Sequence, residues 1–441
     1  MVEIHIPEKV NKIIHTLQEH GYEAYAVGGC VRDSFLGREP MDWDITTSAM
    51  PEETKALFPH TFDTGIEHGT ITVLLDHEGF EVTTYRVDGK YEDSRHPKEV
   101  IFVRNLQEDL LRRDFTINAM AYNEKEGLVD IFGGMDDLKA GIIRCVGNAQ
   151  ARFSEDALRI LRGIRFAAQL GFELEDETRE GMRLLAPTLR KISAERIQVE
   201  LVKTLTSSRP DLLREAWKLG ITKEFLPEFD LAMETTQETV HHMYTVGEHI
   251  LHTLLEVRPD RILRLTMLLH DIGKPYMKTM DADGVAHFKG HPEKSSELAN
   301  EILHRLKFDN DTIRKVTKLV RYHDHRMPVT PAHVRRAVHE IGEDLFPLYL
   351  EVRRADVAAQ SMYQHKEKVA DIDGVEKLYH EIMERKECVS LKMLAVTGKD
   401  LIATGMKPGK EIGQMLEHFL DLVLEHPELN QKEELLKRIE L

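Results

Sequence analysis

The stretch AYAVGGCVRDSFLGREPMDWDIT, residues 24–46, decides the fold of this chain. It begins with a short apolar run that stops at Gly28 and Gly29, and a helix-forming segment follows at once. Two glycines let the backbone turn sharply and leave N–H groups uncovered. The first N–H groups of a helix have no partner within it, so they favour an anion. The order predicts a strand, a glycine turn and a helix that hold a phosphate, with Arg32 beside it.

Two carboxylates follow this helix at a spacing typical of a metal site. Asp42 and Asp44 flank Trp43, and in a strand residues i and i+2 face the same side. Two adjacent carboxylates repel each other unless a cation lies between them, and Mg²⁺ prefers hard oxygen ligands, few of them from the protein. Each motif alone is common in unrelated proteins. Together, within one strand–helix–strand unit, they predict metal-assisted nucleotidyl transfer.

These motifs resemble the class II tRNA nucleotidyltransferases. Gly28-Gly29-x-x-Arg32 followed by Asp42-x-Asp44 is similar to the signature of the CCA-adding enzymes and bacterial poly(A) polymerases of the polymerase β superfamily. The resemblance implies an α+β fold, with an N-terminal polymerase-β-like sheet-and-helix head followed by all-α neck, HD and tail regions. It also implies that Asp42 and Asp44 are catalytic ligands of Mg²⁺ and that the glycine turn and Arg32 bind the nucleotide.

The length of 441 residues allows several domains and a sizeable core. We predict four domains: a catalytic nucleotidyltransferase head at 1–145, a helical neck that recognises the nucleobase at 146–235, an HD metal-binding domain at 236–345, and a helical tRNA-binding body and tail at 346–441. No run of 18 apolar residues occurs, so we expect no membrane partner. The three distant cysteines and the absence of a signal pattern predict a cytoplasmic protein.

The net charge of −17 argues against indiscriminate binding to polyanions. A nucleic-acid partner would therefore need one concentrated basic patch. The segment from Arg95 to Arg165 is rich enough in arginine to provide it. Between these two it holds Arg104, Arg112, Arg113, Arg144, Arg152, Arg159 and Arg162.

The rest of the N-terminal third predicts a helix at 7–20 and strands at 70–75 and 80–86. Glu81, on the second of these strands, is either a third carboxylate near the metal or an ordinary exposed residue. The polar segment 88–100 predicts a mobile loop. In the resembled family a flexible loop at this place serves the addition of the terminal adenosine, so its presence favours CCA or A addition over CC addition.

The segment 108–122, EDLLRRDFTINAMAY, predicts a helix. Its Arg112-Arg113-Asp114 resembles the RRD motif of the family, which contacts the sugar and phosphates of the nucleotide. Arg113 offers a fork of donors for phosphate. Asp114 can accept from ribose hydroxyls, which would select ribonucleotides. The alternative is an ordinary charged helix surface.

The segment 153–170 predicts a second helix with Ser154 as its N-cap. Its polar residues recur every three positions, which is also typical of a solvated face with one Asp–Arg pair. Its start resembles the templating motif EDxxR of the family, in which Asp and Arg read the base edge. C and A carry an exocyclic amine where U and G carry a carbonyl, so one Asp can accept the first two and reject the others. The resemblance assigns Asp156 and Arg159 to the base, and Arg162 and Arg165 to base or phosphates.

Histidines are dense between 241 and 325 and resemble the HD phosphohydrolase pattern of one His, an adjacent His-Asp, a further His and a final Asp. Imidazole with carboxylate suits Mn²⁺, Fe²⁺, Ni²⁺ or Mg²⁺. The activity there stays open between 2′,3′-cyclic phosphate removal, phosphatase work and no catalysis. The predicted ligands are His249, His270, Asp271 and Asp324, with His291 as a fifth ligand or substrate contact and His242 as an alternative to His249.

The last hundred residues predict helices at 332–341, 345–361 and 366–386, and two more near the end. Lys399, Lys407 and Lys410 lie at glycine turns, where they either bind tRNA phosphates or flank helix caps.

We therefore predict an enzyme that adds CCA to tRNA 3′ ends from CTP and ATP without a template, as a monomer or homodimer. Its partners are tRNA, CTP and ATP, and its cofactors are Mg²⁺ in the head and a divalent transition metal or Mg²⁺ at the HD site. One rival is an A-adding enzyme or poly(A) polymerase. Another is an HD phosphohydrolase acting on RNA 3′ ends, whose front half only binds RNA.

Overall fold

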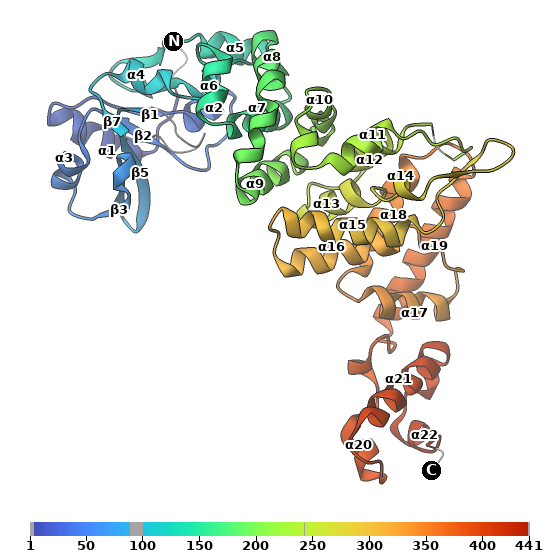
Figure 1. Cartoon of the computed structure of the whole chain (residues 1–441). Helices are drawn as coiled ribbons and strands as arrows, with labels where there is room; N and C mark the ends of the chain where they lie inside the picture. The colour runs from blue at the N-terminus through green and yellow to red at the C-terminus, as the bar shows by residue number, and fades with distance from the viewer. Residues whose placement is uncertain (1–3, 89–99, 242, 440–441) are drawn as a thin grey trace. The chain divides into compact units, whose positions relative to one another are not determined.

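The computed structural model describes residues 4–88, 100–241 and 243–439. The chain divides into two compact units, Met1–Pro227 and Glu228–Leu441. Figure 1 shows the larger strands in the blue part of the chain, and helices from green to red. The α+β class predicted from the sequence is confirmed, whereas the division into four domains stays a prediction.

The first unit is built on a seven-stranded mixed sheet with the order β3-β4-β5-β2-β1-β8-β9. Neighbouring strands are antiparallel except β2 and β5, which are parallel. Every residue of β1 is buried, so the glycine turn that follows β1 begins at a strand anchored in the core. The strands are β1 (Ala24–Val27), β2 (Ile45–Thr47), β3 (Thr61–Gly65), β4 (Thr70–Leu75), β5 (Glu78–Thr84), β8 (Met120–Asn123) and β9 (Gly127–Asp130).

Helices flank this sheet and continue beyond it to the end of the unit. Two short strand pairs accompany them, β6 (Arg86–Asp88) with β7 (Val100–Phe102) and β10 (Ile142–Ile143) with β11 (Glu173–Leu174). The helices are α1 (Glu8–Glu19), α2 (Gly29–Phe35), α3 (Pro51–Leu57), α4 (Leu106–Leu111), α5 (Gly134–Ala140), α6 (Ala149–Glu155), α7 (Leu158–Leu170), α8 (Asp176–Leu185), α9 (Ala194–Leu205) and α10 (Leu213–Lys218), with 3-10 turns at Ile66–His68, Thr116–Asn118, Ala186–Lys191, Pro210–Leu212 and Thr222–Glu224.

Over its described residues the second unit is helical apart from one small hairpin, β12 (Thr279–Met280) and β13 (Ala286–His287). Phe346, Tyr349 and Tyr379 pack at the centre of one core, and the last helices form another around Phe419. Its helices are α11 (Pro227–Glu234), which begins at the end of the first unit, α12 (Val246–Glu256), α13 (Arg261–Leu269), α14 (Lys274–Met277), α15 (His291–Arg305), α16 (Asn310–Tyr322), α17 (Pro331–Ile341), α18 (Phe346–Ala358), α19 (His365–Glu384), α20 (Gly398–Ala403), α21 (Lys410–Glu425) and α22 (Lys432–Leu436), with 3-10 turns at Leu391–Met393 and Pro427–Leu429.

Several elements follow the sequence prediction closely. The helix expected at 7–20 is α1, the two expected strands are β4 and β5, and the three C-terminal helices are α17, α18 and α19. The predicted loop 88–100 falls mostly outside the described residues. Among the described helices, none is long and apolar enough to cross a membrane.

The helix predicted over 108–122 is wrong for most of its length. Helix α4 ends at Leu111, a 3-10 turn follows, and Met120–Asn123 is the strand β8 between β1 and β9. The carboxylate of Asp114 accepts a hydrogen bond from the N–H of Phe115, which competes with helical hydrogen bonding. The apolar run that looks helical is in fact a strand buried in the sheet.

The helix predicted over 153–170 is two helices, α6 and α7. Ser154 lies inside α6, whose N-cap is Asn148. The break comes at Asp156, whose Oδ1 accepts a 3.0 Å hydrogen bond from the N–H of Leu158 at the start of α7. An aspartate that binds the backbone in this way ends one helix and starts the next.

Candidate functional site

The glycine turn at the end of β1 packs against an arginine. Gly28 has φ +83°, a conformation that favours glycine. A Cβ atom added there would lie 3.0 Å from Nη1 of Arg113, closer than side-chain carbons normally approach. The turn therefore brings the Arg113 guanidinium against the backbone, where the sequence predicts phosphates.

Arg32 is buried and is held by two neighbours. Its Nη1 donates a 2.6 Å hydrogen bond to Oδ1 of Asn118, and its Nε and Nη2 each donate a 2.9 Å bond to Asp33. These bonds fix the guanidinium next to the glycine turn.

Asp42 and Asp44 lie in the loop that enters β2, not in the strand, which begins at Ile45. Both still line the same cavity. Burial raises the pKa of Asp44; the charge of Arg113 opposes this, and the charges of Asp42 and Glu81 add to it. The neighbouring carboxylates destabilise the ionised form of Asp44, and a divalent cation bound between them would stabilise it. These oxygen donors therefore fit Mg²⁺.

A carboxylate that the sequence did not single out holds both arginines of the RRD segment. Asp109 is completely buried, and its oxygens lie 2.8 Å from Nη2 of Arg112 and 3.4 Å from Nη2 of Arg113. Burial alone would raise the pKa of Asp109, but the two arginines outweigh burial and lower it. The spacing of three and four residues is a helical ion-pair signal that could have revealed Asp109.

Asp114 has several partners within the chain. It accepts hydrogen bonds from the N–H of Phe115 at 2.8 Å, Nδ2 of Asn118 at 3.2 Å and Nε of Arg162 at 2.7 Å. Burial alone would raise the pKa of Asp114, but the charge and hydrogen bond of Arg162 and the bond from Asn118 lower it to about 2. Asp114 is therefore ionised at neutral pH and orients Arg162.

Asp156 and Arg159 are both held at the junction of α6 and α7. Oδ2 of Asp156 accepts a 2.8 Å hydrogen bond from Nη2 of Arg196. Arg159 donates from Nη1 to Oε2 of Glu155 at 2.7 Å and from Nη2 to the carbonyl of Arg112 at 2.8 Å. These bonds hold the two predicted base-reading residues beside the RRD segment.

One aromatic ring, that of Phe166, contacts three arginines. The guanidinium carbons of Arg165, Arg32 and Arg162 lie 3.9, 5.2 and 5.3 Å from the ring centroid. Arg165 also donates a 2.5 Å hydrogen bond to Glu200 on α9. Each cation–π contact contributes about 0.5–2 kcal/mol. Phe166, which the sequence did not reveal, therefore orients arginines predicted to contact the nucleotide.

These side chains line one cavity of about 490 Å³, a size within the ~300–1,000 Å³ of typical ligand pockets. Seven arginines and four aspartates line it, so it is locally positive in a chain of net charge −17. That charge suits a nucleoside triphosphate. The eleven residues predicted for the nucleotide and its metal all line it: Gly28, Gly29, Arg32, Asp42, Asp44, Arg113, Asp114, Asp156, Arg159, Arg162 and Arg165.

A second cluster lies in the second unit, where four histidines and two aspartates meet. All six are buried, and they come from α12, α15 and α18 and from the residues that follow α13 and α16. They are His249, His270, Asp271, His291, His323 and Asp356.

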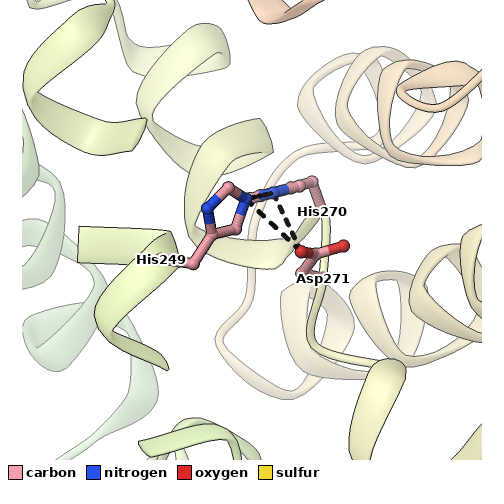
Figure 2. A group of neighbouring side chains, drawn as sticks. All are labelled: His249, His270 and Asp271. Carbon is pink, nitrogen blue, oxygen red and sulfur yellow. Dashed lines mark hydrogen bonds and ion pairs between the residues drawn. The ribbon is translucent and has the colours of Figure 1, made fainter. Parts of the chain in front are cut away.

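The cluster contains two groups that share Asp271. In the first, the Nε2 atoms of His249 and His270 are 3.3 Å apart and lie 3.6 and 3.4 Å from Oδ2 of Asp271. In the second, the Nε2 atoms of His291 and His323 are 3.2 Å apart, and each lies 3.4 Å from Oδ1. Figure 2 shows the first group, with ring nitrogens turned towards the carboxylate. Each group presents three ligand atoms close enough to hold one ion.

The backbone decides which ring nitrogen carries the proton. Nδ1 of His270, His291 and His323 lies 2.8, 2.9 and 2.6 Å from a carbonyl oxygen three residues earlier, and Nδ1 of His249 lies 3.3 Å from the carbonyl of Ala359. A carbonyl can only accept, so Nδ1 donates and Nε2 keeps the lone pair that binds a metal. Two such Nε2 atoms 3.2–3.3 Å apart repel unless a cation or proton lies between them. The donors therefore fit metal ions.

The two carboxylates of the cluster are ionised. Burial alone would raise the pKa of Asp271, but Lys274, whose Nζ lies 2.6 Å from Oδ2, lowers it well below its usual range. Without a metal, a proton on Nε2 of His249, which lies 3.0 Å from Oδ1 of Asp356, outweighs burial and lowers the pKa of Asp356. Buried anions among imidazoles suit a divalent transition metal.

The structure places Asp356, not the predicted Asp324, among the histidines. Asp324 is half-buried, and its Oδ1 lies 3.3 Å from Nη2 of Arg326 and 3.6 Å from Nη1 of Arg353. His323, its neighbour, is the residue of this segment that reaches the cluster. Asp356 belongs to the distant helix α18, so only the packed fold reveals it. The alternative ligand His242 lies outside the described residues.

Family models match most of the chain. The poly(A) polymerase head domain matches residues 24–144, and the probable RNA- and SrmB-binding site of polymerase A matches 171–233. The HD domain matches 239–337, and tRNA nucleotidyltransferase domain 2 matches 290–439.

The chain is 36% identical to the CCA-adding enzyme of Levilactobacillus brevis over 416 residues, which is 93% of each chain. The chain belongs to the CCA-adding enzyme family. A second member, from Limosilactobacillus reuteri, is 34% identical over 438 residues, covering 98% of this chain and 96% of the relative. The family resemblance that the glycine turn, the paired aspartates and the RRD and EDxxR motifs indicate is therefore confirmed.

Solved members of the CCA-adding enzyme family share the fold. The Bacillus stearothermophilus enzyme in complex with CTP has a TM-score of 0.70 and 29% identity, covering 97% of this chain and 96% of that one. The Thermotoga maritima enzyme complexed with tRNA has a TM-score of 0.61 over 99% of this chain and 97% of that one; at 22% identity it supports the fold alone.

Phe166→Leu is expected to raise KM for CTP and ATP about tenfold, with a smaller effect on kcat. The change removes the ring that the three arginines share and so weakens their orientation. A loss of about 1.4 kcal/mol of binding free energy corresponds to a factor of ten in affinity. Phe166→Tyr keeps the ring and should retain near-wild-type KM. Steady-state incorporation into tRNA measures both. Phe153→Leu, a buried phenylalanine of α6 beside Gly181, is the control, and an equal rise in KM there would contradict the orienting role.

Asp356→Asn is expected to lower metal affinity in the second unit by more than about tenfold, whereas Asp324→Asn leaves metal content unchanged. Of these two residues, only Asp356 has a carboxylate oxygen near a predicted ligand: its Oδ1 lies 3.0 Å from Nε2 of His249. Loss of a ligand or of the group that orients it costs about 10–100-fold in affinity. Elemental analysis after dialysis against a metal buffer measures this. The reverse order of the two variants would restore Asp324 as the ligand.

Proposed function

We propose that this chain adds C, C and A to the 3′ ends of tRNA, with CTP and ATP as substrates. The supporting observation is a cavity of the first unit in which the glycine turn, the paired carboxylates Asp42 and Asp44 and seven arginines meet. Near-full-length similarity to CCA-adding enzymes supports the same activity.

Asp42 and Asp44 would hold the Mg²⁺ of the reaction. Bound there, Mg²⁺ supplies charge neutralisation at the reacting phosphate and a more acidic tRNA hydroxyl. Arg32 and Arg113 bind the phosphates beside the glycine turn, and they stabilise the pyrophosphate as the 3′ oxygen of tRNA bonds to the α-phosphorus.

Asp156 and Arg159 select the base. Each carboxylate oxygen has two acceptor sites, so Oδ2 of Asp156 can accept an exocyclic amine beside its bond from Arg196. Arg159, held by Glu155, donates to ring acceptors. Both C and A carry the required amine, whereas U and G present a carbonyl that repels the carboxylate.

The decisive experiment incubates the protein and Mg²⁺ with tRNA that ends at the discriminator base, using CTP, ATP or both. Two nucleotides added with CTP alone and three with both would support CCA addition. A single A added only to tRNA ending in CC would instead identify an A-adding enzyme. Long A tails would identify a poly(A) polymerase.

We propose a cytoplasmic location, because Cys30, Cys145 and Cys388 are all unpaired and buried, as suits a reducing compartment. The expectation of a monomer or homodimer stays a prediction.

A second activity is favoured by the histidine–aspartate cluster. We propose that it binds a divalent transition metal, or Mg²⁺, and hydrolyses phosphate esters at RNA 3′ ends, including 2′,3′-cyclic phosphates. The cluster opens into a cavity of about 520 Å³ that is also lined by Lys274, Lys289 and Arg326, which suit a phosphate. Water would add to phosphorus as one P–O bond breaks, and the released oxygen would take the proton. Absence of metal-dependent opening of cyclic-phosphate-ended RNA would remove this proposal.

A further inference from the structure

A second, smaller cavity adjoins the histidine–aspartate cluster and has no role in either proposed reaction. It measures about 210 Å³ and lies among α18, α19 and residues 325–327. Arg326, Asp356 and Gln360 line both this cavity and the larger one over the metal cluster. The two cavities are therefore neighbours that share one wall.

The amide of Gln360 lies in this wall and has partners on both sides. Nε2 of Gln360 donates a 3.0 Å hydrogen bond to Oδ2 of Asp356, and its Oε1 accepts a 2.8 Å bond from Nζ of Lys368. Asp356 in turn contacts His249 of the cluster. A ligand that extends past Gln360 would have one end at the metal cluster and the other in the smaller cavity.

Charged side chains of both signs line the smaller cavity. The cations are Arg326, Arg353 and Lys368, and the carboxylates are Asp356, Glu367 and Asp371; of the cations, Arg326 also lines the larger cavity. Burial lowers the pKa of Lys368, and the charge of Arg326 lowers it further. Asp324 offsets part of this charge through its pairs with Arg326 and Arg353. Lys368 and Arg326 repel each other, and a phosphate bound at this junction would stabilise both cations.

The smaller cavity has the chemistry of a base pocket. Apolar side chains of Leu350, Val357 and Ile372 line its inner part, and Gln364 and Glu367 line its exposed side. Its volume is below the ~300–1,000 Å³ of pockets for drug-sized ligands, so it fits one planar ring system. Amide and carboxylate groups can pair with the polar edge of such a ring.

Gln364 supplies an independent observation. It has φ +51° and ψ 28° directly before α19, a left-handed conformation that is uncommon for glutamine. Strained backbone of this kind gathers at ligand sites. Gln364 also lines the cavity, where its side chain can contact a ligand.

We propose that this cavity, which we call the nucleoside pocket, binds the base of a nucleotide whose phosphate lies at the histidine–aspartate cluster. The nucleotide is either free or the last residue of an RNA. This inference rests on the proposed hydrolytic activity of the second unit and assigns the place in that unit that would hold the base of its substrate.

The test uses the full chain and the variant Gln364→Trp, which places a bulky ring at the pocket. Lys366→Trp, an exposed change two residues away, is the matched control. The first readout is calorimetric binding of 3′-AMP to metal-stripped protein. Nucleotide binding in the head is the same in all forms, so a difference belongs to the pocket. We expect Gln364→Trp to weaken this component about tenfold and Lys366→Trp to leave it unchanged.

The second readout compares hydrolysis of 2′,3′-cyclic AMP with that of bis-p-nitrophenyl phosphate, which has no base. Gln364→Trp should raise the ratio of the two KM values about tenfold. Unchanged binding and an unchanged ratio would overturn the nucleoside pocket. If the wild-type protein hydrolyses neither ester, the proposed hydrolytic activity is wrong. The binding measurement would still show whether the nucleoside pocket exists. The third comparison uses a tRNA that ends in a cyclic phosphate. If Gln364→Trp slows its hydrolysis, the ligand of the pocket is an RNA end; if only free nucleotides are affected, the ligand is a free nucleotide.

Discussion

Replacing Asp42 by asparagine should lower CMP and AMP incorporation into tRNA about a thousandfold. The change keeps the shape of the side chain but removes one of two carboxylates that line the head cavity. A metal contributes several kcal/mol of charge stabilisation to the transition state, and each 1.36 kcal/mol is a factor of ten in rate. Single-turnover incorporation on tRNA lacking CCA measures the effect.

Two comparisons make this result specific. Asp136→Asn, an exposed aspartate in the first turn of α5, should leave incorporation unchanged. Hydrolysis of cyclic-phosphate-ended RNA by Asp42→Asn should equal wild type, because the histidine–aspartate cluster lies in the other unit. Incorporation at the wild-type rate by Asp42→Asn would refute the catalytic role of this carboxylate.

Asp271→Asn is expected to reduce metal affinity of the second unit by more than about a hundredfold and to abolish the hydrolytic activity that we propose for it. Asp271 is the one residue shared by both groups of ligands, so its loss weakens both. Removal of outer partners already costs about 10–100-fold, and loss of a direct ligand should cost more. Elemental analysis and hydrolysis of cyclic-phosphate-ended RNA measure the two effects.

The same variant should add CCA at the wild-type rate, since no residue of the head cavity belongs to the second unit. Asp283→Asn, an exposed aspartate between β12 and β13, is the matched control and should keep both activities. Full metal content in Asp271→Asn would show that the histidines do not hold an ion with this carboxylate.

The sequence predicts the head cavity well because its motifs are local. Gly28 and Gly29, the pair Asp42 and Asp44, and the RRD segment can each be recognised from a few consecutive residues, and the cavity brings them together. The α+β class follows from the same segments. What local patterns cannot show is support from distant residues, such as the ring of Phe166 beneath three arginines.

The structure differs from the prediction where distant pairing or packing outweighs the local pattern. The segment 108–122 looks helical, but strand β8 pairs with β1 and β9 and overrides that propensity. The histidine pattern indicates the second cluster, yet its last carboxylate comes from α18, where Asp356 follows no motif. Asp324, which follows His323 in the chain, forms ion pairs with Arg326 and Arg353.

The unequal share of carboxylates in the two ligand groups has a consequence for stoichiometry. His249 and His270 can draw on Asp356 as well as Asp271, with Oδ1 of Asp356 3.0 and 3.8 Å from their Nε2 atoms. Among the residues that the structure describes, the only carboxylate paired with His291 and His323 is Asp271, whose charge a first ion already neutralises. Ions should therefore load in sequence, the first tightly and the second weakly. A preparation that carries one ion per chain would be half-loaded, and full hydrolytic activity would return only when excess metal fills the second position.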